Sequence, residues 1–214
     1  MTVYDIVEDS LVAEKTIQWG RTLQHFPKHA QLIAQLITEW NVIEFNFVNL
    51  LSAMLKAPIP IVSPMVFALA NNRARLDVMD VATTRLAADP EMKHLITELF
   101  AEARAVLKIR NDYTHGLYVI QTSARNTLLQ MQDFHDYHAG KKQSRRTITA
   151  KTLVSEVERA EELAGDIFLV FQAVVGALPL RASHESGVPS PPGTEQVYHR
   201  RIGKRRMPPQ SSQP

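Results

Sequence analysis

Apolar residues recur at helical spacing through long stretches of this chain, and prolines mark where those stretches stop. Between residues 28 and 56 they follow the repeat of one helix face, at Leu32, Leu36, Trp40, Ile43, Phe47, Leu50 and Met54. The next segment, Ala57-Pro58-Ile59-Pro60, predicts a helix end, because proline lacks an amide hydrogen and restricts the residue before it. An amphipathic helix of this length must bury one face, which favours a helical bundle.

Two more segments begin with a capping residue followed by proline. Ser63-Pro64 predicts the start of a helix that runs to about Ala88, and Asp89-Pro90 predicts another that ends near His115. Gly116 is expected to take the left-handed conformation that ends many helices. Long helices joined by short connections predict antiparallel neighbours in a bundle.

The period of the apolar residues changes after the third helix. Residues 117–121 and 127–131 are expected to form a β-hairpin, and residues 146–149 a third short strand. Residues 152–178 return to helical spacing. The sequence thus predicts one all-α domain over residues 1–178, with a small β-hairpin insertion at about 117–149. Residues 179–214, rich in proline, serine and arginine, are expected to be a disordered tail.

Composition excludes several kinds of site. The chain has no cysteine, which excludes disulfides, zinc–thiolate sites, iron–sulfur clusters and thiol catalysis. No apolar run approaches the roughly twenty residues of a membrane span, and we expect a cytoplasmic protein without a membrane segment. The tail holds six basic and two acidic residues, net +4, and the other 18 basic and 20 acidic residues give −2. Attraction to phosphates must therefore be local or come from the tail.

The third helix ends with Arg110-Asn111-Asp112-Tyr113-Thr114-His115. Arg110 continues the apolar stripe of this helix, where a guanidinium needs a carboxylate partner, a cleft or an anionic ligand. Arginine binds phosphate oxygens with a planar donor fork, and histidine transfers protons near neutral pH. With Asn111 to hold either side chain, Arg110 and His115 supply the groups of a phosphodiester site that requires no metal.

One geometric objection applies to a site within a single chain. Five residues of an ideal helix turn by about 140°, so Arg110 and His115 of one chain do not converge. A site shared across a twofold dimer axis removes this objection.

The motif resembles the R-N-x-x-x-H form of the motif in HEPN domains, and the resemblance extends over roughly residues 28–178 as helical architecture. HEPN domains are all-α bundles that commonly dimerise with the motif at a shared cleft, and many are metal-independent endoribonucleases, including toxins of toxin–antitoxin pairs and other defence effectors. The resemblance implies that Arg110 stabilises phosphate charge, His115 transfers a proton and Asn111 orients them. It also implies an RNA substrate, no cofactor, a homodimer and an inhibitory protein partner.

Two other interpretations stay open. Some HEPN proteins have lost catalysis, so the chain is alternatively a non-catalytic dimeric HEPN-like module for interaction or nucleotide binding. The strand pair after Gly116 also departs from the simplest bundle pattern. In the plainest interpretation, Arg110 pairs with a carboxylate of another helix, and His115-Gly116 is an ordinary helix terminus.

Several residues are candidates for supporting roles. Glu39 is a candidate carboxylate for Arg110, and Asn46 is a candidate to border the same cleft. Tyr113 and Tyr118 flank the motif, where they could stack on a base or belong to the core.

Three further groups of residues have weaker patterns. Arg73 and Asp77 have the spacing of a helical ion pair. Residues 133–138 carry metal-capable side chains without a metal-binding spacing, so no metal site is expected. The basic cluster at residues 199–206 suits RNA phosphates or a solubilising tail equally.

Overall fold

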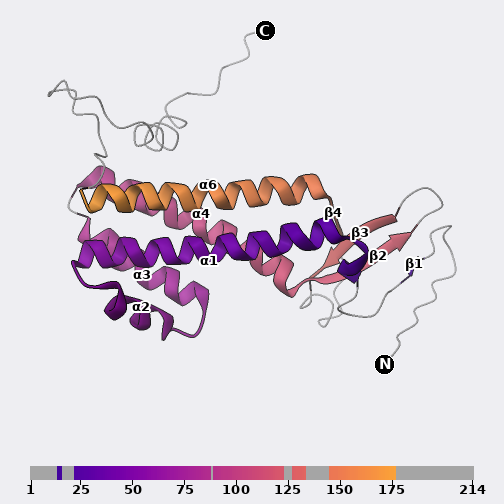
Figure 1. The fold of residues 1–214 in the computed structure, drawn as a ribbon, viewed down its shortest axis with the longest axis horizontal. Helices are drawn as coiled ribbons and strands as arrows, with labels where there is room; N and C mark the ends of the chain where they lie inside the picture. Colours follow the sequence, from indigo (N-terminus) through magenta and orange to yellow (C-terminus); the bar gives the residue numbers. More distant parts are fainter. Residues whose placement is uncertain (1–13, 16–21, 88, 123–126, 134–144, 177–214) are drawn as a thin grey trace, which may run out of the picture. The chain divides into compact units, whose positions relative to one another are not determined.

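The computed structural model describes residues 14–15, 22–87, 89–122, 127–133 and 145–176 (Figure 1). The elements in chain order are β1 (Glu14–Lys15), the 3-10 helix η1 (Thr22–His25), α1 (Pro27–Leu55), α2 (Ile59–Phe67), α3 (Asn72–Leu86), α4 (Pro90–His115), β2 (Leu117–Thr122), β3 (Thr127–Gln132), β4 (Arg146–Ile148) and α6 (Ala150–Val174). The predicted fold class, mostly helical with a small β insertion, is confirmed. The predicted tail and most of residues 133–138 lie outside the described residues.

By their contacts, the described residues group into two compact units, and the single domain over residues 1–178 stays a prediction. Unit 1 holds those up to Glu39 and those from Val106 to Arg159, and unit 2 holds Trp40–Ala105 and those from Ala160 onward. Helices α1, α4 and α6 each contribute residues to both units. Each unit is therefore built from two separate stretches of chain.

Unit 2 has a helical core around the second half of α1. Residues 46–52 of this helix are all buried, which requires neighbours on several sides. Phe47 stacks on Phe100 of α4, with ring centroids 4.0 Å apart and planes 15° from parallel. On another side, Asn46 Nδ2 donates a hydrogen bond to the carbonyl of Ala164 in α6 at 2.9 Å.

Arg75 of α3 joins three parts of unit 2. Its Nη1 lies 3.1 Å from Glu44 Oε1 on α1, and its Nε donates to the Leu69 carbonyl at 3.0 Å. The guanidinium also lies over the Phe67 ring of α2, 4.9 Å from the centroid. The Glu44 side chain is 7% exposed and the Arg75 side chain 18%, so this is a largely buried ion pair whose loss would leave a charge without its partner.

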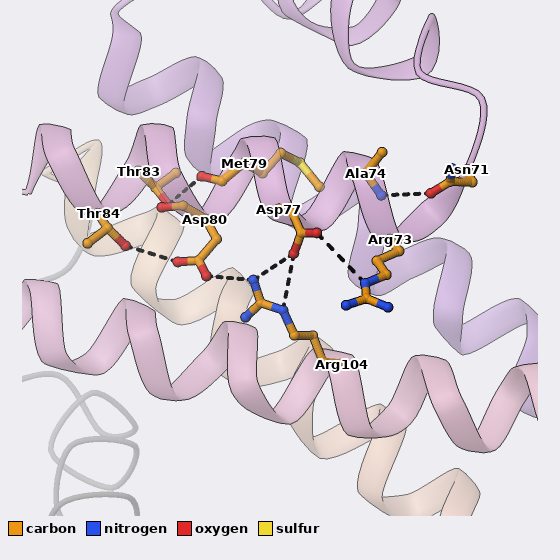
Figure 2. A network of polar contacts seen from close by, with 9 residues as sticks. All are labelled: Asn71, Arg73, Ala74, Asp77, Met79, Asp80, Thr83, Thr84 and Arg104. Atoms are coloured by element: carbon orange, nitrogen blue, oxygen red, sulfur yellow. Dashed lines mark hydrogen bonds and ion pairs between the residues drawn. The ribbon is translucent and has the colours of Figure 1, made fainter.

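A second ion-pair network joins α3 to α4 at the surface (Figure 2). Arg104 of α4 lies between Asp77 and Asp80 of α3, with Nη2–O distances of 3.0 and 2.7 Å. The predicted pair of Arg73 and Asp77 is confirmed at 4.0 Å. These exposed pairs contribute little energy individually, and the network fixes which face of α3 meets α4.

The helix predicted from Ser63 to about Ala88 is two helices, so this boundary prediction was wrong. Helix α2 begins earlier, at Ile59, and ends at Phe67, with Pro64 inside it. Helix α3 begins after Asn71, whose side chain accepts a hydrogen bond from the Ala74 amide at 2.8 Å. Asparagine is a strong N-cap, and here it starts a new helix.

Left-handed residues follow α1 and α6, but not α4. Lys56 has φ 54° and Gly176 has φ 74°. The amides of Lys56 and Ala57 donate to the carbonyls of Ala53 and Ser52, which is the Schellman pattern of a helix C-terminus. Gly116 has no positive φ, so its predicted role as a left-handed cap was wrong.

Gly116 is needed for a close approach between α4 and β3. A Cβ at this position would lie 2.4 Å from Met131 Sδ and 2.7 Å from the Asp112 carbonyl oxygen. Both distances are far below van der Waals contact, so a side chain requires its surroundings to shift. The absence of a side chain lets the chain leave α4 and enter β2 beside β3.

The sheet belongs to unit 1 and has the antiparallel strand order β1-β2-β3-β4. The three predicted strands are confirmed, with Leu117 opposite Gln132 and Met131 opposite Arg146. The backbone of Glu14–Lys15 adds β1, which the sequence did not predict. The buried side chains of the sheet are Ile120, Leu129, Met131, Gln132 and Ile148. None of the described helices combines the length and the apolar character of a membrane span.

Candidate functional site

The motif residues lie in the last two turns of α4, within unit 1. Val106 and Tyr113 are buried on this helix, 1% and 2% exposed. Arg110 lies four residues after Val106 and three residues before Tyr113, so it shares their inward face, as predicted. Its side chain is half-buried, whereas His115, the last residue of the helix, is exposed.

The Arg110 guanidinium is only partly satisfied. Its Nη1 donates a hydrogen bond to Asn111 Oδ1 at 2.9 Å. Its Nε is buried and has no hydrogen-bond partner in the described part of the chain. A buried donor without an acceptor is costly, so this guanidinium is suited to an anionic ligand.

The surroundings of His115 leave its imidazole accessible. The neighbouring Thr114 hydroxyl turns back to donate to the Arg110 carbonyl at 2.8 Å, and Asp112 pairs with Lys108 at 3.6 Å. Within the described residues of unit 1, no hydrogen bond or ion pair is found for the His115 side chain. The ring can therefore accept or donate a proton to a bound molecule.

Two tyrosines hold the last turn of α4. The Tyr118 hydroxyl of β2 donates to the Tyr113 carbonyl at 2.5 Å, which satisfies one carbonyl that the helix end leaves open. The Glu156 carboxylate of α6 lies near the Tyr113 hydroxyl, and Arg146 of β4 lies over the Tyr113 ring, 4.9 Å from its centroid. Burial raises the pKa of both tyrosines well above the usual value, and the Glu156 contact raises that of Tyr113 further.

The predicted supporting residues have different places in the structure. Tyr113 is a core residue, so it presents no free ring face to a base, whereas Tyr118 is half-buried. Asn46 belongs to unit 2, where its bond to Ala164 accounts for its burial. Glu39 belongs to unit 1, is half-buried and makes contacts of its own.

Sequence reasoning missed the two residues that contact Tyr113 from a distance along the chain. Arg146 begins a short strand and Glu156 lies on the last helix. Neither has a local pattern that indicates a partner on α4, because helix and strand periodicity reveal which face is buried but not what covers it. Among the described residues, no three histidine, aspartate or glutamate side chains are grouped as metal ligands.

Comparisons of the chain with family models, with curated proteins and with solved structures found no match. The chemistry at the end of α4 is therefore the basis on which a function can be proposed.

Proposed function

We propose that this protein is a metal-independent endoribonuclease of the HEPN type that acts as a homodimer. The observation that carries the proposal is the half-buried Arg110 guanidinium with an unsatisfied Nε, at the same helix end as an exposed His115. An arginine that served only to join helices would be expected to have a carboxylate partner. Here the free donor and the accessible imidazole match what an RNA phosphodiester requires.

The reaction is an internal transesterification that consumes no water. The ribose 2′-oxygen forms a bond to phosphorus while the bond from phosphorus to the 5′-oxygen of the next nucleotide breaks. An imidazole accepts the proton of the 2′-hydroxyl, and a protonated imidazole donates one to the leaving 5′-oxygen. The guanidinium of Arg110 stabilises the charge that accumulates on the phosphate oxygens, and Asn111 holds its Nη1. The products are a 2′,3′-cyclic phosphate and a 5′-hydroxyl.

A dimer supplies the geometry that one chain lacks. Arg110 and His115 are separated by about 140° around the helix axis, since each residue of an α-helix turns by about 100°. Two copies related by a twofold axis would place the arginine of one chain beside the histidine of the other. In each of the two sites, the imidazole that accepts the proton of the 2′-hydroxyl becomes the acid that protonates the leaving 5′-oxygen.

The proposed biological setting is an RNA-cleaving toxin or defence effector in the cytoplasm. A nuclease of this kind must be restrained in the cell that makes it, so the proposal includes an inhibitory protein partner. A partner that covers Arg110 and His115 would block the site without any change in the fold.

The first test incubates purified protein with mixed RNA in EDTA and compares wild type with His115→Ala and Arg110→Ala. We expect wild type to generate cyclic-phosphate ends, and either variant to lose about 10²- to 10⁴-fold in rate. His94→Ala is the matched control, because His94 is also an exposed histidine of α4 but lies near its start. Intact RNA with folded, dimeric wild-type protein would support the alternative of a non-catalytic interaction or nucleotide-binding module.

The shared site is tested by mixing the two inactive variants. If the arginine of one chain acts with the histidine of the other, a mixed dimer has two different sites. One site contains both Arg110 and His115, and the other contains neither. When equal amounts of the two variants are mixed and allowed to exchange subunits, about half of the dimers are mixed. Since one of the two sites in each mixed dimer is complete, roughly a quarter of wild-type activity should return. No restoration, with exchange confirmed by differently tagged chains, would place the site within one chain and contradict the dimer model.

A further inference from the structure

A second arginine lies beside the last turn of α4. Arg146, the first residue of β4, is exposed, and its guanidinium lies 4.9 Å from the centroid of the Tyr113 ring. Its charge also opposes the rise in the pKa of both Tyr113 and Tyr118. It is therefore close to the two tyrosines that precede and follow His115-Gly116 in the sequence.

The buried Tyr113 ring limits where the Arg146 guanidinium can lie. Tyr113 is 2% exposed, and the Glu156 carboxylate of α6 lies near its hydroxyl. A ring buried to this extent has little freedom to turn, and Arg146 lies over one of its faces. An arginine held over an aromatic ring loses little further freedom on binding a ligand, and its hydrogen-bond donors remain available to a phosphate.

Arg146 is available for an anion. No ion pair joins it to a carboxylate in the part of unit 1 that the structure describes. Lys108, another exposed cation near this helix end, differs because it pairs with Asp112 at 3.6 Å. The negative end of the α4 dipole accounts for a cation here, but it would not require a planar guanidinium over a buried ring.

We propose that Arg146 binds a phosphate of single-stranded RNA next to the scissile one, and so extends the site from α4 onto the sheet. This inference rests on the proposed ribonuclease function. The contact is to the backbone, so it adds affinity without selecting a base. The β-hairpin insertion thereby acquires a role in substrate binding, beyond its role in fixing the end of α4.

The test measures RNA binding in a His115→Ala background, in which cleavage does not deplete the probe. Fluorescence anisotropy with a labelled single-stranded RNA of mixed sequence is recorded from low to moderate KCl. Arg146→Gln should weaken binding roughly three- to tenfold at low salt. It should also reduce the slope of log affinity against log salt by about 0.7, the value for one lost phosphate contact on a single strand.

Two further variants make the result specific. Arg146→Lys keeps the charge but not the planar guanidinium, so it should retain most of the salt slope with intermediate affinity. Arg73→Gln is the matched control in unit 2, where an 87% exposed arginine side chain has only a 4.0 Å ion pair; it should leave both quantities unchanged. Equal affinity and slope for Arg146→Gln and Arg73→Gln would overturn the inference, as would the absence of RNA binding by folded protein.

The failure of this inference can be distinguished from the failure of the proposed function. If wild type cleaves RNA and Arg146→Gln keeps the full salt slope, the nuclease proposal stands and the role of Arg146 is refuted. If wild type does not cleave but Arg146→Gln lowers affinity and slope, the phosphate contact stands and the protein binds RNA without cutting it.

Discussion

Two glycine-to-alanine substitutions should change stability in opposite directions. Gly165 is an exposed residue inside α6, and a Cβ there would meet no atom within 4 Å. Alanine at this position should stabilise the protein by about 0.5–1 kcal/mol, because glycine has more conformational freedom to lose in a helix. Gly116 is also in a right-handed or extended conformation, so backbone strain does not distinguish the two positions.

The surroundings of the added methyl group make the difference. At Gly116 it would lie 2.4 and 2.5 Å from Sδ and Cγ of Met131, and 2.7 Å from the Asp112 carbonyl oxygen. The methionine side chain can turn away, but the carbonyl belongs to the backbone of α4 and cannot move without disturbing the helix end. Overpacking of this kind costs about 1–3 kcal/mol, so Gly116→Ala should be less stable than wild type.

Urea unfolding followed by circular dichroism measures both effects. With a slope of about 2 kcal/mol/M, the midpoint should rise by about 0.25–0.5 M for Gly165→Ala and fall by about 0.5–1.5 M for Gly116→Ala. The loss for Gly116→Ala should be smaller in a Met131→Ala background, since one of the two obstacles is then absent. A Gly116→Ala midpoint at or above that of wild type would refute the close approach as the reason for this glycine.

Three other predictions concern charged and titrating residues. Arg110→Met should abolish RNA cleavage yet leave the free energy of unfolding unchanged or raise it by about 1 kcal/mol, because it removes a buried donor without an acceptor; a loss above about 2 kcal/mol in urea unfolding would show a structural role. Glu44→Ala should cost about 3–5 kcal/mol in the same assay, since Arg75 stays largely buried without its carboxylate, and a cost below about 1 kcal/mol would contradict this. Tyr113 and Tyr118 have raised pKa values in the folded state, so their stabilising contribution is complete below about pH 10, the unfolded value, and declines as pH rises further. Stability measured from pH 9 to 11.5 should therefore decline above pH 10, less steeply in Tyr113→Phe, and an equally steep decline in that variant would count against this assignment.

Much of the helical architecture follows from local sequence signals. Pro58 marks the end of α1, and Asp89-Pro90 marks the start of α4, because proline restricts the backbone in the same way whatever surrounds it. The break between α2 and α3 also had a local signal, the N-cap Asn71, but Ser63-Pro64 offered a competing start. Choosing between two such signals depends on tertiary packing, here the burial of Val62 and Val66 by α2 and of Leu76 by α3.

The candidate site was predictable only along one helix. The inward direction of Arg110 and the exposure of the helix end at His115 follow from spacing. The contacts of Tyr113 with Arg146 and Glu156 depend on where β4 and α6 meet α4, which no local pattern encodes. Gly116 illustrates the same limit. Met131 of β3 leaves no room for a side chain there, whereas the backbone angles of Gly116 do not themselves require glycine.

The division of the chain into two interleaved units bears on when the protein can fold during translation. Both units take residues from α6, the first up to Arg159 and the second from Ala160 onward. Neither can be completed before the ribosome has synthesised this helix, so the apolar residues that α6 covers stay exposed in the nascent chain until then. A nascent chain that ends before α6 already contains the whole motif of α4. It lacks Glu156, so the surroundings of Tyr113 are complete only after α6 has been synthesised.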